Sequence, residues 1–141
     1  MTLGYRPILN PVDPFEEVIG PFYERQEAGG GMSYAFQVRE AHTNMAGITH
    51  GGMLMSFADT VVAQAAFAAN GGDHVVTLSM STAFLAPART GDLVECRPRL
   101  IRRTAEILFV SGDFMVGGVT ILTADSLWKT IRLRPKTAKD R

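Results

Sequence analysis

The sequence predicts an α+β fold in which one antiparallel β-sheet wraps around a single long helix. Two observations lead to this prediction. Residues 51–70 form a run that is apolar on most sides, which indicates a helix buried on more than one face. Before and after this run the hydrophobic pattern has a period of two, which is typical of strands. One sheet around one helix is the simplest way to bury such a helix.

Length and composition favour one ordinary globular domain over residues 1–141, with a core over 32–132. Fourteen basic and fourteen acidic side chains cancel, so no global field attracts nucleic acid or a membrane, and we expect neither as a partner. The single cysteine, Cys96, excludes an internal disulfide and a cysteine-rich zinc site. The N-terminus has no long apolar stretch, and polar residues interrupt the run 53–69, which together predict a cytoplasmic protein.

The first thirty residues are interpreted as a lead-in with one short helix. Within the stretch 13–25, Asp13 is a plausible N-cap and Pro14 occupies the first helical position. Pro21 should limit or kink this helix. A half-buried strand is then expected over 32–40, because Met32, Tyr34, Phe36 and Val38 alternate with polar residues.

The long helix should end at the Asn-Gly-Gly sequence of residues 70–72, and four strands should follow. They are expected over 74–85, 93–103, 105–116 and 119–134, with a turn at 117–118 and a flexible tail over 135–141. Pro98 argues for an edge or a bulge in the second of these strands. Five strands cannot cover the helix without leaving an open edge, so the pattern predicts a dimer.

The sixteen residues 44–59, NMAGITHGGMLMSFAD, carry a specific pattern. Asn44, Gly47, the triplet His50-Gly51-Gly52 and Asp59 occupy the spacing found in the active-site segment of hotdog-fold acyl-CoA thioesterases. The sequence resembles the phenylacetate-degradation branch of that family, and FLAPARTGDLV at 84–94 resembles its later strand-and-turn signature. The resemblance implies a hotdog fold and an acyl-CoA substrate. It implies no cofactor apart from the coenzyme A of the substrate, and a homodimer or a dimer of dimers.

The chemistry explains these residue types. Negative charge develops on the carbonyl oxygen during thioester hydrolysis, and free N–H groups at a helix start can stabilise it. Gly51 leaves room for the thioester, and Asp59 can act as general base on a water or as a nucleophile. Partial burial should raise the proton affinity of Asp59. The resemblance supports both mechanisms, so the choice between them stays open.

The distance between Gly51 and Asp59 indicates where the site lies. Eight positions at about 1.5 Å per residue separate them by about 12 Å along one helix, too far for both to reach one thioester carbon. Two antiparallel helices across a two-fold axis would pair Gly51 of one subunit with Asp59 of the other. Two equivalent sites per dimer follow.

Further roles are implied by the resemblance. Asn44 would position the water or the carboxylate, His50 would flank the oxyanion hole, and Thr77 would lie near the nucleophilic water. A second group would bind coenzyme A; it comprises Phe84, Pro87, Arg89, Arg102, Arg103 and Thr104. Arginines near a turn suit phosphate oxygens.

Simpler interpretations remain open. Asp59 also belongs to a polar stripe with Ser56, Thr60 and Gln64, which a solvated helix face would show. Asn44 could cap a turn, His50 could bond to backbone, and Thr77 and the arginines could be ordinary surface polarity. His42 and His74 have no metal-ligand spacing, so no metal is predicted. A non-catalytic acyl-CoA sensor and, last, a hydratase on the same fold are the alternative functions. The acyl group itself cannot be deduced from the sequence.

Overall fold

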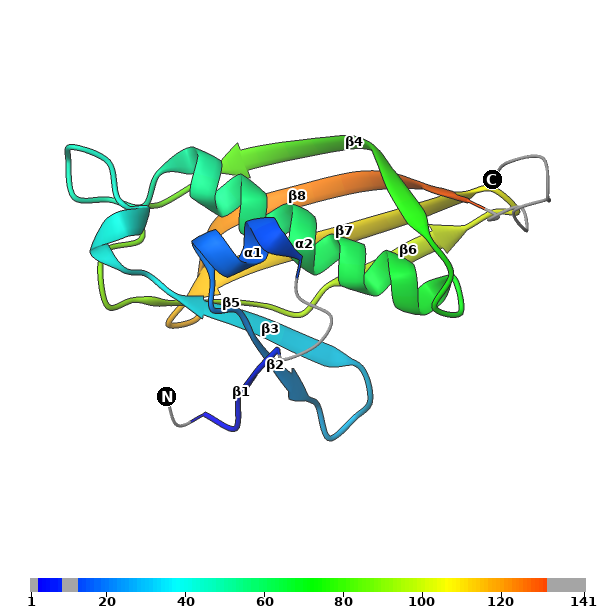
Figure 1. Cartoon of the computed structure of the whole chain (residues 1–141), viewed down its shortest axis with the longest axis horizontal. Coiled ribbons are helices and arrows are strands. Elements are labelled where there is room, and N and C mark those ends of the chain that lie inside the picture. Colours follow the sequence, from blue (N-terminus) through cyan, green and yellow to red (C-terminus); the bar gives the residue numbers. More distant parts are fainter. Residues whose placement is uncertain (1–2, 9–12, 132–141) are drawn as a thin grey trace, which may run out of the picture.

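The computed structural model describes residues 3–8 and 13–131 and shows one curved antiparallel sheet around one long helix, as predicted (Figure 1). The elements in chain order are β1 (Arg6–Pro7), α1 (Pro14–Ile19), β2 (Tyr23–Gln26), β3 (Met32–Gln37), the 3₁₀ helix η1 (Glu40–His42), α2 (Gly51–Ala69), β4 (Val75–Phe84), β5 (Leu93–Cys96), β6 (Arg99–Arg103), β7 (Ile107–Val116) and β8 (Val119–Thr130).

The sheet has eight strands in the order β1-β2-β3-β5-β7-β8-β4, and β6 pairs with β7. The predicted number of five is wrong for three reasons. Residues 6–7, expected to lie in an irregular lead-in, form β1 and pair with β2. Residues 23–26, for which no strand was expected in the lead-in, form β2 and pair with β3; α1 ends at Ile19, before Pro21, which was expected to limit or kink it. The stretch 93–103 is split into β5 and β6 around Pro98, which has no N–H to donate to a ladder.

Strand β3 is more buried than predicted. Tyr34 and Phe36 are buried, but so are Ser33 and Ala35 on the opposite face. These two side chains are small, and β3 is flanked by β2 on one side and β5 on the other. Only Gln37 is exposed among the last five residues of the strand. The polar–apolar alternation therefore marked the strand correctly and overstated the exposure of its outer face.

The core lies between α2 and the sheet. Phe57 of α2 packs edge-on against Phe36 and Phe114, with ring centroids 4.7 and 5.7 Å apart. A second cluster surrounds Val62 and Trp128 further along the helix. By length and composition alone α2 could cross a membrane, but its buried side chains account for its apolar character as a core helix.

Both predicted helix caps are present. Asp13 accepts a hydrogen bond from the Glu16 N–H at 2.8 Å, with Pro14 at the first helical position of α1. At the end of α2 the N–H groups of Gly71 and Gly72 donate to Ala68 and Phe67, and both glycines have positive φ. The limits predicted for α2 are therefore confirmed to within one residue. The tail over 135–141 lies outside the described residues.

A β-bulge in β4 positions one predicted site residue. Thr77 pairs with Trp128 and Ser79 with Leu127, so Leu78 is the extra residue. Side chains alternate along a strand, and an extra residue reverses that alternation. As a result Thr77 and Met80, although three positions apart, both face α2.

Candidate active site

The first turn of α2 is held by its N-cap residue, His50. The His50 Nδ1 atom accepts a hydrogen bond from the Gly52 N–H at 2.9 Å. The His50 N–H donates to the His42 carbonyl at 2.8 Å, and the N–H and hydroxyl of Thr49 both donate to the Ala88 carbonyl. These bonds fix the loop that leads into the helix. His50 therefore lies at the start of the helix, where it acts as the N-cap residue.

His50 accepts the Gly52 N–H, and the N–H of the preceding residue, Gly51, remains available. Within the described part of the chain the Gly51 N–H donates to no acceptor. This donor lies at the positive end of a 19-residue helix, which favours a developing negative charge. It is the group on which an oxyanion site can be built.

The absence of a side chain at Gly51 has a reason in the structure. A Cβ atom at this position would lie 3.3 Å from Cε1 of the Phe84 ring, tighter than ordinary contact. Phe84 closes β4 and is half-exposed, so its ring lies beside the helix start and remains open to a ligand. Phe84, which was predicted to bind coenzyme A, therefore forms one surface with Gly51.

Asp59 lies in the middle of α2, on the side that faces β4. The hydroxyl of Thr77 donates to its Oδ1 atom at 3.1 Å. Partial burial raises the pKa of Asp59 above the ordinary aspartate value, and the Thr77 hydrogen bond opposes this increase to a smaller extent. The carboxylate keeps a second oxygen for a water or a thioester. A half-buried base with raised pKa is suited to proton abstraction.

Asn44 lies in the exposed loop between η1 and α2. Its Oδ1 atom accepts the Ala46 N–H at 2.9 Å and the Ile48 N–H at 3.4 Å, while its own N–H donates to the Ile48 carbonyl. These bonds make a turn of the type that asparagine favours. Within one subunit Asn44 shapes this loop, as the simpler interpretation proposed.

The predicted coenzyme A residues fall into two groups. Phe84, Pro87 and Arg89 lie near the start of α2, since Ile48 and Arg89 form a β-bridge. Arg102, Arg103 and Thr104 lie at its other end, where the Arg103 guanidinium donates to the Ala69 carbonyl. The helix of 19 residues is about 27 Å long at about 1.5 Å per residue. One subunit therefore does not bring both groups to one ligand.

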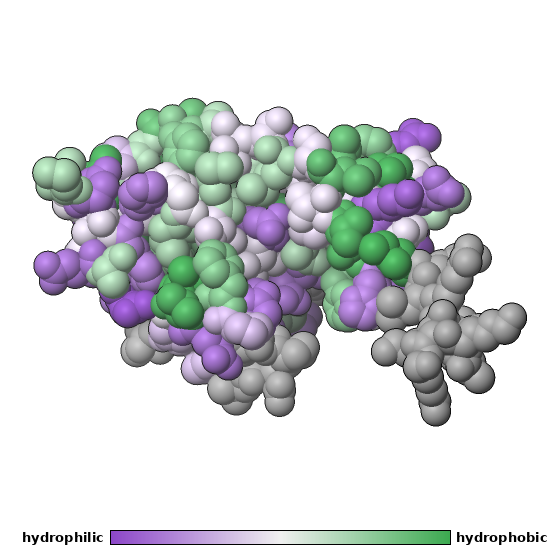
Figure 2. All heavy atoms as spheres, turned by 45° about the horizontal axis from the view of Figure 1, so that its top comes forward, coloured by the Kyte–Doolittle hydropathy of each residue, from purple (hydrophilic) through white to green (hydrophobic). Residues whose placement is uncertain are grey.

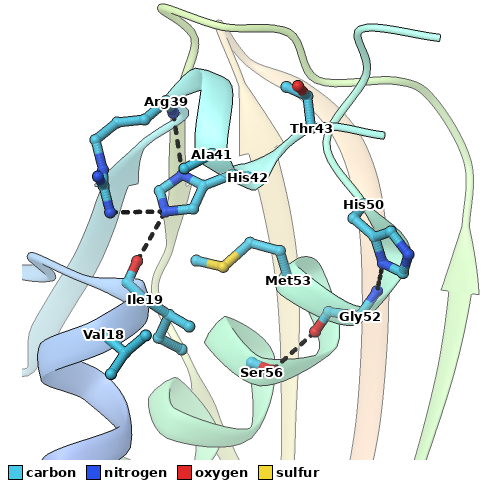
Figure 3. Close-up of a pocket in the computed structure, with 10 residues that line it drawn as sticks. All are labelled: Val18, Ile19, Arg39, Ala41, His42, Thr43, His50, Gly52, Met53 and Ser56. Carbon is cyan, nitrogen blue, oxygen red and sulfur yellow. Dashed lines mark hydrogen bonds between the residues drawn. The ribbon is translucent and has the colours of Figure 1, made fainter. Parts of the chain in front are cut away.

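A pocket that the sequence pattern did not predict lies beside the helix start. Its volume is about 460 Å³, and its walls come from α1, η1 and the first turns of α2 (Figure 3). His42 closes one side: its Nδ1 accepts the Arg39 N–H at 3.0 Å and its Nε2 donates to the Ile19 carbonyl at 2.8 Å. Burial lowers the pKa of His42, in keeping with this neutral form. Contacts between residues 19 and 42 leave no local sequence pattern.

Comparison with known proteins identifies a matching family and several relatives. The Thioesterase superfamily matches residues 46–121, a segment that includes Gly51, Asp59 and Thr77. A Pseudomonas aeruginosa protein provisionally named an esterase is 29% identical over 126 residues, which cover 89% of this chain and 93% of that protein. Human acyl-coenzyme A thioesterase 13 is 26% identical over 116 residues, covering 80% of this chain and 83% of that protein.

A solved structure from Ralstonia eutropha JMP134, described as a thioesterase-like protein related to phenylacetic acid degradation, superposes with a TM-score of 0.75. It is 28% identical and covers 85% of this chain and 92% of its own. The predicted hotdog fold, the predicted thioesterase activity and the resemblance to the phenylacetate-degradation branch are thereby confirmed. Because the family match spans more than half of its residues, the chain belongs to the Thioesterase superfamily.

Proposed function

We propose that this protein hydrolyses an acyl-CoA thioester to a carboxylic acid and coenzyme A, at two equivalent sites in a homodimer. Each site combines the Gly51 N–H of one subunit with Asp59 of the partner subunit. The observation that carries this proposal is the unused Gly51 N–H at the start of α2, on the same helix as a half-buried carboxylate. These two groups are an oxyanion donor and a base, about 12 Å apart in one chain.

The edge of the sheet supports dimer formation. β4 is the last strand of the sheet, and along its ten residues it pairs only with β8 among the described strands. Val76, Leu78 and Phe84 on this strand are 40, 52 and 53% exposed, and Leu85 follows at 58%. Figure 2, which looks toward the β4 side, shows patches of hydrophobic residues on this surface. A long apolar edge strand is a template for pairing with a second copy.

The outward face of α2, between β4 and α1, is suited to the same contact. Gly52, Ser56 and Ala63 follow one another along the helix and are small, so a second helix can approach closely. Met55 on the adjoining stripe is 39% exposed although it is apolar. Asp59 lies between Met55 and the row formed by Gly52, Ser56 and Ala63. Pairing two β4 strands antiparallel would set two α2 helices side by side in opposite directions, with Asp59 of the partner subunit close to Gly51.

This arrangement also reunites the two groups of predicted coenzyme A residues. If Asp59 of the partner subunit lies opposite Gly51, the partner helix continues for ten residues, or about 15 Å, past that point. Arg102 of the partner subunit would then lie on the same side of the dimer as Phe84 and Arg89 of the first subunit. A ligand as long as coenzyme A could contact both. A dimer of dimers would leave this geometry unchanged.

The reaction follows from these positions. In the general-base route, the Asp59 carboxylate takes a proton from a water as the water oxygen bonds to the thioester carbon. The carbonyl oxygen becomes an oxyanion and accepts the Gly51 N–H. The carbon–sulfur bond then breaks, and the coenzyme A thiolate leaves and is protonated. In the nucleophilic route the carboxylate attacks the carbon, the carbon–sulfur bond breaks with loss of the coenzyme A thiolate, and a water hydrolyses the resulting anhydride; the same two residues serve both routes.

The test is thiol release from a panel of aliphatic and aromatic acyl-CoAs. We expect hydrolysis by the native protein and a loss of about 10²–10⁴-fold in kcat for Asp59→Asn, with binding of the acyl-CoA retained. Binding without turnover by the native protein would instead support the sensor. A Gln64→Glu variant, changed further along the same helix, is the matched control and should retain activity.

A further inference from the structure

We propose that the pocket between α1, η1 and the start of α2 holds the acyl group, and that Arg39 selects acyl groups ending in a carboxylate. The substrates of this class are coenzyme A monothioesters of dicarboxylic acids. The inference rests on the proposed function, because it concerns the acyl part of the same substrate. It adds a specificity-determining residue to the site.

The pocket adjoins the helix start that carries the proposed oxyanion donor. His50, Gly52, Met53 and Ser56 line it, and all four belong to the first two turns of α2 or to its N-cap. Gly51 lies within this run. A thioester whose carbonyl oxygen meets the Gly51 N–H therefore has the mouth of the pocket beside its carbonyl carbon. The volume of about 460 Å³ is sufficient for an acyl chain of moderate length.

The walls suit the methylene part of an acyl chain. Val18 and Ile19 of α1 lie on one side and Met53 of α2 on the other (Figure 3). Val18 is 76% exposed in one subunit, an unfavourable position for a valine that has nothing to cover it. Flexible methionine side chains adapt to varied apolar groups. An aliphatic chain passing between α1 and α2 would bury both Val18 and Met53.

Most polar groups of the pocket are already used within the protein. The Ser56 hydroxyl donates to the Gly52 carbonyl at 2.8 Å, and the Thr43 hydroxyl donates to the Glu40 carbonyl at 2.7 Å. Both ring nitrogens of His42 have backbone partners. These groups fix the shape of the pocket and leave little to recognise a ligand.

Arg39 is the exception. One of its terminal nitrogens, Nη2, donates to the Gly20 carbonyl at 2.7 Å and lies 3.3 Å from His42 Nε2, whereas a guanidinium has five N–H donors. No ion pair between described side chains includes Arg39, and no Asp or Glu lines the pocket. The pocket thus holds a permanent positive charge without a carboxylate. The fork of N–H donors on a guanidinium matches the two oxygens of a carboxylate.

The position of Arg39 sets the orientation of the ligand. Figure 3 shows its side chain across the pocket from Gly52 and His50, with Met53 between them. An acyl chain that starts at the helix N-terminus and crosses Met53 ends beside the guanidinium. A terminal carboxylate would pair with Arg39, while a terminal methyl group would leave the charge unpaired next to apolar carbon.

The experiment compares adipyl-CoA with hexanoyl-CoA, and suberyl-CoA with octanoyl-CoA, by thiol release corrected for the rate without protein. The native protein should have a kcat/KM about tenfold higher for the better carboxylate-ended substrate than for its methyl-ended counterpart. Arg39→Gln should abolish this preference, because its kcat/KM should fall about tenfold further for the carboxylate-ended substrates than for the methyl-ended ones. Ala41→Asp, which places a carboxylate in the pocket without removing a hydrogen bond, should reverse the preference.

Arg97→Gln is the matched control, because Arg97 is also exposed and also donates to a backbone carbonyl, that of Gly30. It should retain the native preference. Equal rates for both members of each pair in the native protein, or equal losses on both in Arg39→Gln, would overturn the inference while hydrolysis itself remained. Absence of hydrolysis of every thioester would instead refute the proposed function and the inference with it. The comparison in the native protein and in Ala41→Asp does not depend on the folding of Arg39→Gln.

Discussion

The Asp59 carboxylate combines partial burial with one hydrogen bond, from Thr77. Burial disfavours the charged form and raises its pKa, whereas the hydroxyl donor favours the charged form. Burial is the larger influence, so the pKa of the Asp59 carboxyl lies above the ordinary aspartate value. The basicity of this group is therefore set by its burial on α2 and by its neighbour on β4.

Thr77→Val should move the pH dependence of activity. Removing the hydroxyl removes the bond that lowers the pKa of Asp59, so the pKa should rise further. Since the base works when ionised, the acidic limb of the kcat/KM profile should shift to higher pH. Ser79→Ala, on the same strand but facing away from α2, is the control and should leave the limb in place. An unchanged limb in Thr77→Val would show that another group titrates.

Asp59→Asn should separate activity from stability. The folded-state pKa of Asp59 is raised, so the ionised carboxylate lowers stability at pH values above that pKa, and this cost disappears below the ordinary aspartate pKa. A neutral amide can still accept the Thr77 hydroxyl. The variant should therefore lose activity while its melting temperature at pH 7 stays equal or rises. Thermal unfolding followed at pH 7 and at pH 4 measures this, and the difference should be smaller at pH 4. A marked loss of stability at pH 7 would point to a structural role.

At the level of elements, the sequence was most informative where structure is set locally. The Asp13 cap and the ends of α2 each depend on a few adjacent residues, and both were predictable. Pro98 indicated an irregularity within 93–103, although not the division into β5 and β6. β2 was not predictable, because residues 23–26 become a strand only by pairing with β3, which follows a turn. The orientation of Thr77 was also out of reach, since it depends on the bulge at Leu78 and hence on pairing with β8.

In the candidate site, too, the features set by adjacent residues were predictable and those set by tertiary contacts were not. The motif of residues 44–59 placed Gly51 and Asp59 on one helix, and their separation followed from helix geometry. The pocket beside them escaped prediction because α1 and η1 meet only through tertiary contacts. Arg103 illustrates an ambiguity that sequence alone could not resolve: it was assigned to phosphate binding, and in the structure it caps the C-terminus of α2.

Arg103→Gln should therefore weaken the end of α2. The guanidinium donates to the Ala69 carbonyl at the negative end of the helix, an arrangement that contributes about 0.3–1 kcal/mol. Denaturant unfolding should show a loss of that size. Arg102→Gln, one position earlier and exposed, should leave the free energy of unfolding nearly unchanged. If instead the two variants lose equal stability, the capping bond is not significant in solution.

At the scale of the whole molecule, function depends on the edge of the sheet. β4 carries Thr77 toward α2 and presents Val76 and Leu78 to solvent. In the proposed dimer this edge is covered, and the same contact brings Asp59 of the partner subunit to Gly51. Assembly and catalysis should therefore be lost together when the edge is blocked.

Leu78→Lys should produce a folded but inactive monomer, because a charged side chain on an edge strand opposes pairing. Light scattering after size exclusion would give the mass, circular dichroism the fold, and thiol release the activity. Ile101→Lys is the control: Ile101 is 58% exposed on β6, away from the β4 edge. It should remain at least dimeric and active. A monomeric Leu78→Lys with full activity would show that one chain suffices.

The most direct test of a site shared between subunits uses two inactive variants, Asp59→Asn and Gly51→Val, joined as one heterodimer with different affinity tags. Valine at position 51 should abolish activity by itself, because even its Cβ atom would crowd the Phe84 ring. In the heterodimer one site has both native residues and the other has neither, so about half of the native activity should return. A heterodimer of correct mass without activity would contradict the shared site.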